Sequence, residues 1–74
     1  MNANQLINKL TWEEVTSKDA DRRRILRNER MNLQVAVGRR PTQPAHIAAQ
    51  MREAVRVAEM WGVEFDAEPK QASL

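Results

Sequence analysis

The sequence predicts an all-α fold, a small helical hairpin of two long helices with a short N-terminal helical segment packed across it. Three observations favour this fold. Apolar residues recur at spacings of four and three near the C-terminal end, as on the buried side of a helix that packs against a near-antiparallel neighbour: Ile47, Met51, Ala54, Ala58 and Trp61. Gly38 and Gly62 each follow a helical pattern, at the position where glycine commonly ends a helix. The segment Thr11-Trp12-Glu13-Glu14 has the form of an N-terminal capping box.

The first element is a helical segment over residues 3–10, because Leu6, Ile7 and Leu10 share one helical face and Asn2 or Asn4 can cap it. The capping box then predicts a new helix start at Trp12, with Leu10 and Val15 in the spacing of a hydrophobic staple. We expect a break near Ser17. A single helix over residues 12–37 is the alternative.

The first long helix is expected over residues 19–37, ending at Gly38, and the second over residues 43–61, with Thr42 as its cap. The expected core positions of the first are Ile25, Leu26, Glu29, Leu33, Ala36 and Val37, and Val55 widens the apolar seam of the second. After Gly62, Val63 is expected to fold back on Ala58, as in a Schellman motif.

A period-two alternation in two segments leaves a strand alternative open. Leu33, Val35 and Val37 alternate in this way, and so do Val63 and Phe65. A lone two-stranded ribbon is marginally stable, so we favour helices.

The length of 74 residues indicates one domain, which we place at residues 1–66, followed by a flexible tail at residues 67–74. A chain this short buries only about 60% of its unfolded surface, so its core is marginal. The sequence has no cysteine and one histidine, which excludes disulfides and multi-histidine metal sites. We therefore expect support from self-association, as a homodimer, or from a larger protein, with no metal and no cofactor.

Catalysis and membrane insertion are both disfavoured. A nucleophile needs an adjacent base, and nothing in the sequence brings Ser17 to His46, so we expect no enzyme activity. No run of 18 apolar residues and no signal-peptide core is present, which predicts a cytoplasmic protein without a membrane span.

The charge distribution is uneven. Residues 22–40 hold seven arginines against one glutamate, a net charge of +6, whereas the whole chain carries only +2. Arg23, Arg27 and Arg30 step along one helical face, and Arg39 and Arg40 extend the charge into the loop. These five are the candidate anion- or partner-binding residues, because guanidinium groups suit phosphate and carboxylate. The alternative is a solvated helix face with ordinary intrahelical pairs, such as Asp19 with Arg23 and Arg56 with Glu59.

Four large apolar side chains lie near element ends and are the candidate partner contacts: Trp12, Met31, Met60 and Trp61. The alternative is that the tryptophans belong to the core. We therefore expect a small non-catalytic protein-interaction module, a regulator, inhibitor or adaptor of a kind common in phages and mobile elements. The alternative is a nucleic-acid-binding protein that places its arginines on phosphates.

Overall fold

The computed structural model describes residues 1–64, which form three α-helices: α1 (Ala3–Thr16), α2 (Ala20–Ala36) and α3 (Pro44–Met60). These residues contain no strand, so the all-α prediction is confirmed and the two-stranded ribbon is not formed by residues 33–37. The predicted flexible tail at residues 67–74 and the position of Phe65 lie outside the described residues.

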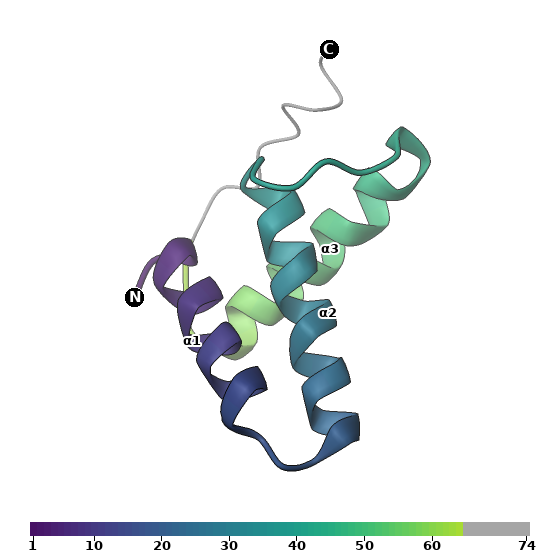
Figure 1. Cartoon of the computed structure of the whole chain (residues 1–74). Coiled ribbons are helices and arrows are strands. Elements are labelled where there is room, and N and C mark those ends of the chain that lie inside the picture. Colours follow the sequence, from purple (N-terminus) through teal and green to yellow (C-terminus); the bar gives the residue numbers. More distant parts are fainter. Residues whose placement is uncertain (65–74) are drawn as a thin grey trace.

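Helix α2 lies in the middle of the fold. It packs against both α1 and α3, and the short turn at residues 17–19 lets α1 and α2 run in opposite directions side by side (Figure 1). Helix α3 passes behind α2 and ends beside α1 (Figure 1). The two long helices are thus part of a three-helix arrangement, in which the N-terminal segment is itself a helix of 14 residues.

The predicted helix start at Trp12 is wrong, because α1 continues through Thr11 without a break. Its cap is Asn2, whose side chain accepts a hydrogen bond from the Gln5 amide (2.9 Å) while the Gln5 side chain accepts one from the Asn2 amide (2.8 Å). Thr11 instead donates its hydroxyl to the Ile7 carbonyl at 2.8 Å, as threonine does inside a helix. The continuous helix keeps Leu10 in the core and leaves Glu14 free to reach α2.

The predicted break near Ser17 is confirmed, which excludes a single helix over residues 12–37. Ser17 is extended, with φ −73° and ψ 138°, and Asp19 then caps α2. The Asp19 carboxylate accepts hydrogen bonds from the amides of Asp21 (2.9 Å) and Arg22 (3.3 Å). This cap satisfies donors that the first turn of a helix otherwise leaves unpaired.

Both predicted glycine stops are confirmed, because Gly38 and Gly62 have φ of 76° and 70°. Beyond Gly62, the Val63 amide donates to the Ala58 carbonyl at 2.8 Å and Val63 is buried, which confirms the Schellman motif. The predicted Thr42 cap is wrong. Gln43 occupies the N-cap of α3 without a side-chain hydrogen bond, and Pro44 in the first turn lacks one of the amide donors that a cap would satisfy.

The core lies where all three helices meet, and ten buried residues form it: Leu6, Ile7, Leu10, Leu26, Leu33, Ala36, Ala54, Val57, Ala58 and Val63. Two expected core residues are instead substantially exposed, Ile25 at 56% and Val55 at 38%. Val57 takes a core position that the predicted seam omitted. The buried face of α3 carries Ala54, Val57 and Ala58, which pack against the other helices. Val55 lies off this face and is therefore more exposed.

Because the cap of α1 is Asn2, Asn2→Ala is expected to lower the free energy of unfolding by about 1 kcal/mol. Thr11→Ala serves as the matched control, since it removes only an in-helix hydroxyl and places a strong helix former there; it is expected to change stability by about 0.5 kcal/mol or less. Urea unfolding followed by circular dichroism measures both. A larger loss for Thr11→Ala than for Asn2→Ala would contradict the assignment.

Candidate functional site

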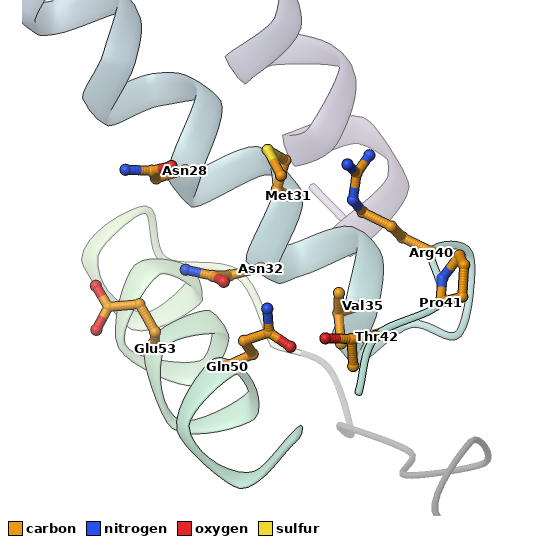
Figure 2. Close-up of a pocket in the computed structure, with 9 residues that line it drawn as sticks. All are labelled: Asn28, Met31, Asn32, Val35, Arg40, Pro41, Thr42, Gln50 and Glu53. Atoms are coloured by element: carbon orange, nitrogen blue, oxygen red, sulfur yellow. The ribbon is translucent and has the colours of Figure 1, made fainter. Parts of the chain in front are cut away.

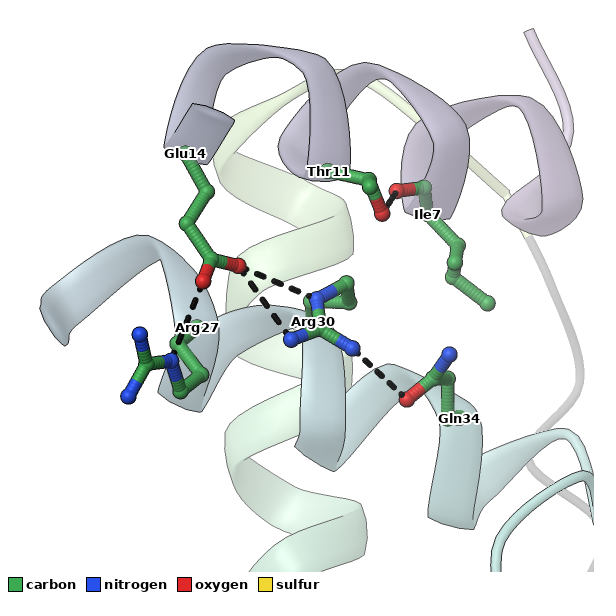
Figure 3. A network of polar contacts seen from close by, with 6 residues as sticks. All are labelled: Ile7, Thr11, Glu14, Arg27, Arg30 and Gln34. Atoms are coloured by element: carbon green, nitrogen blue, oxygen red, sulfur yellow. Dashed lines mark hydrogen bonds and ion pairs between the residues drawn. The ribbon is translucent and has the colours of Figure 1, made fainter. Parts of the chain in front are cut away.

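The arginines of α2 are held by a carboxylate of α1. Arg27 Nε donates to Glu14 Oε2 at 3.0 Å, and both Nε and Nη2 of Arg30 lie 3.2 Å from Glu14 Oε1 (Figure 3). Arg30 Nη1 also contacts Gln34 Oε1 at 3.4 Å. We call these four residues the Glu14 cluster. The Arg27 hydrogen bond, helped by the charge of Arg30, holds the pKa of Glu14 below its ordinary value.

Two more of the predicted anion-binding arginines contact the chain itself. Arg23 Nη1 donates to the Ser17 carbonyl at 2.8 Å, at the turn between α1 and α2, rather than pairing with Asp19. Arg39 Nη1 donates to Asn4 Oδ1 at 3.1 Å and so connects the α2–α3 loop to α1. Contacts within the chain therefore involve Arg23, Arg27, Arg30 and Arg39.

The fifth, Arg40, lines a polar hollow of about 490 Å³ (Figure 2). The lining side chains come from α2, the loop after it and α3: Asn28, Met31, Asn32, Val35, Arg40, Pro41, Thr42, Gln50 and Glu53. Met31 lies here, half-buried, and Gln50 Oε1 is buried without a hydrogen-bond partner. Met31 is thus separated from the other predicted partner-contacting residues.

A second hollow, of about 560 Å³, lies between the N-terminal half of α2 and the C-terminal end of α3. We call it the α2–α3 groove, and its lining residues are Arg22, Ile25, Leu26, Glu29, Arg56, Met60 and Trp61. Of these, Ile25 and Met60 expose 56% and 59% of their surface, although both are large and apolar. Met60 and Trp61 were predicted as partner contacts, and the structure brings them together.

Trp61 lies between the core and the α2–α3 groove. It is half-buried and packs against the core, and it also lines the α2–α3 groove. Lys9 Nζ lies 5.6 Å from the centroid of its ring, a cation–π distance. The end of α3 is therefore held on α1 by a contact to the indole, which fixes one wall of the groove.

Trp12 does not share this site. It is 68% exposed on α1, beside an equally exposed Val15, and α1 contributes no residue to the groove. Ile25 lines the groove instead, although the sequence places this residue on the apolar face of its helix with the expected core residues. The available signal was that Leu26, the neighbour of Ile25, lies seven residues before Leu33 and so shares its face.

Charged groups flank the groove on both helices. Arg22 Nη2 lies 3.9 Å from Glu13 Oε2, an oxygen that is buried and accepts no hydrogen bond. Arg56 pairs with Glu53 rather than with the predicted Glu59. Burial raises the pKa of Glu29, and the positive charge of Arg56 only partly opposes this.

The described residues also bear on metal binding and on membrane spanning. Residues 1–64 contain no group of three His, Cys, Asp or Glu side chains placed to hold a metal ion. Within the same range, every helix is too short or too polar to cross a lipid bilayer.

Glu14 makes the stability of the fold dependent on acid. Because the folded pKa lies below the unfolded one, this carboxylate stabilises the protein above about pH 4.5 and ceases to do so as the pH falls through the folded pKa. Glu14→Gln is therefore expected to lower the thermal midpoint at pH 7, with the difference from the original protein shrinking below about pH 4.5. Thermal scans between pH 3 and pH 7 measure it, and a difference that is independent of pH would contradict the proposed ion pairing.

Glu29 is expected to change the pH dependence of stability in the opposite direction to Glu14. Its folded pKa is raised, so its ionisation destabilises the fold as the pH rises above about 4.5. At a concentration where the chain is monomeric, Glu29→Gln should raise the thermal midpoint at pH 7 and leave it unchanged at low pH, where both side chains are neutral. The same scans test it, and a lower midpoint at pH 7 would show that Glu29 is favourably paired instead.

Comparisons with known proteins give no relative for this chain. No protein-family model, no curated protein and no solved structure matches it. The arrangement of its own residues is therefore the basis for assigning a function.

Proposed function

We propose that this chain is a small non-catalytic protein-interaction module that receives a protein partner in the α2–α3 groove. One observation carries the proposal. Ile25 and Met60, from two different helices, are each more than half exposed at the same hollow, next to Trp61. Large apolar side chains gathered in a concave site lose unfavourable contact with water when a partner covers them.

Covering these side chains would stabilise a complex by an amount that is large for so small a protein. Full burial of an isoleucine or methionine side chain contributes about 1.5–3 kcal/mol. Tryptophan, methionine and arginine are enriched at protein interfaces, and the groove supplies all three through Trp61, Met60 and the pair Arg22 and Arg56. An apolar centre with charged groups at its edge is the usual composition of a docking site. Such a module fits the role of a regulator, inhibitor or adaptor.

The arginines support this assignment over the nucleic-acid alternative. A phosphate that approached Arg27 or Arg30 would compete with Glu14, which is only 13% exposed at its side chain and already accepts hydrogen bonds from both. Arg23 and Arg39 likewise donate to groups of the chain. The apolar groove offers its contacts without such competition.

The proposal predicts that a change confined to the groove abolishes partner capture. The double variant Ile25→Gln/Met60→Gln removes the exposed apolar surface with two good helix formers and is expected to lose captured protein in pull-downs from host lysate. The matched control is Val15→Gln/Val55→Gln, which changes two exposed aliphatic residues outside the groove and should capture normally.

Circular dichroism establishes that both variants remain helical. Equal capture by the two double variants would refute the groove as the docking site. Nuclease treatment provides the remaining comparison: if the captured material disappears with nuclease and is unaffected by Ile25→Gln/Met60→Gln, the arginine surface binds nucleic acid and the groove is not the functional site.

A further inference from the structure

We propose that the occupant of the α2–α3 groove is a second copy of this chain, with the two α2 helices antiparallel across a two-fold axis near Ile25 and Leu26. This inference rests on the proposed function, because it uses the same groove, and it specifies the partner. In a two-fold interface the same surface serves both subunits, so that surface must be complementary to itself.

The order of charges along α2 has this self-complementarity. Arg22 and Glu29 both line the groove, and they are seven residues apart, about 10 Å along the helix axis. Ile25 and Leu26 lie midway between them. When a second α2 is laid antiparallel about this midpoint, each Arg22 faces the Glu29 of the other copy, and the exposed Ile25 side chains meet at the centre.

Arg22 is held only loosely by its ion pair within the chain. Its approach to Glu13 within the chain is 3.9 Å, longer than a hydrogen bond, and 55% of its side chain is exposed. Glu29 lies in the same groove and is half-buried. Burial raises the pKa of Glu29 even though Arg56 and Arg22 of the same chain oppose this, and an arginine from a second copy would offset the burial further.

Helix α3 provides the second wall for the incoming helix. Met60 and Trp61 form this wall, so a second α2 lies in a trough rather than on a flat face. Methionine has a flexible side chain that adapts to an irregular neighbour. The exposed Met60 and Ile25 are then covered together, which also gives this small chain the additional core that its length calls for.

Other occupants match the charges less well. A uniformly acidic helix would pair with Arg22 and Arg56 but would be repelled by Glu29, and a uniformly basic one would meet the reverse problem. A second copy in the parallel direction would place Arg22 opposite Arg22. An antiparallel second copy places a group of opposite charge against both Arg22 and Glu29.

Variants that reverse the charge of Arg22 or Glu29 test the antiparallel arrangement. Arg22→Glu places two carboxylates opposite each other twice in a homodimer, and Glu29→Arg does the same with two guanidinium groups. Each variant alone is expected to dimerise at least roughly tenfold more weakly than the original chain in sedimentation equilibrium. An equimolar mixture of the two should recover a heterodimer, since both cross-pairs are then attractive.

The matched control is the pair Arg52→Glu and Glu59→Arg. These exposed residues are also seven positions apart, but they lie on α3 outside the groove, and their exchange should leave dimerisation unchanged. Folded variants that fail to recover a heterodimer on mixing would overturn the antiparallel arrangement, as would an original chain that stays monomeric at several hundred micromolar concentration.

A second measurement is independent of charge, in case Arg22→Glu unfolds the chain by its closeness to Glu13. The sequence has no cysteine, so Ile25→Cys introduces a single thiol near the proposed axis. Mild oxidation should link most of the Ile25→Cys chains into covalent dimers, and few of the Val55→Cys chains. Equal linkage of the two would overturn the proposal.

A second copy and a foreign protein in the groove give different results. If the purified chain is monomeric while Ile25→Gln/Met60→Gln still abolishes capture from lysate, the groove docks a foreign protein and only the second-copy inference fails. If neither self-association nor capture depends on the groove, the proposed function fails as well.

Discussion

The Glu14 carboxylate fixes how α1 lies against α2, because it accepts hydrogen bonds from both Arg27 and Arg30 while it is largely shielded from water. These charge-assisted hydrogen bonds favour one register between the helix carrying Glu14 and the helix carrying the arginines. The register in turn brings Leu6, Ile7 and Leu10 onto Leu26 and Leu33. It also leaves the opposite side of α2, with Ile25, open beside the end of α3.

The same contact determines which surface is available for function. A basic stretch with a net charge of +6 resembles a binding surface when the sequence is considered alone, yet most of its arginines connect elements of the fold. The apolar groove, by contrast, has no occupant within the described chain. Most arginines of this stretch therefore hold the helices together, whereas the apolar residues of the groove remain exposed.

Local signals predicted the helix ends well and the tertiary contacts poorly. Gly38, Gly62 and the break at Ser17 depend on backbone preferences of single residues, which sequence displays directly. Thr11 was misread because the same four letters suit both a capping box and a helix interior, and only packing of Leu10 decides between them. Arg30 pairs with a residue sixteen positions away, a contact that intrahelical spacing rules do not reach. Ile25 was misplaced because α1 and α3 cover different arcs of α2, so no single apolar stripe describes its buried surface.

The order of the helices in space follows their order in the chain, since α2 packs against its two neighbours in sequence. Most of the tertiary structure can therefore form by closing short loops, whose entropic cost is low, and topologies of this kind fold fast. The contact of Lys9 with Trp61 is different, because it joins the first helix to the residue after the last. It joins residues 52 positions apart, so it costs more loop-closure entropy than contacts between neighbouring helices, and the wall of the groove at Trp61 depends on the first helix as well as on the two helices that line it.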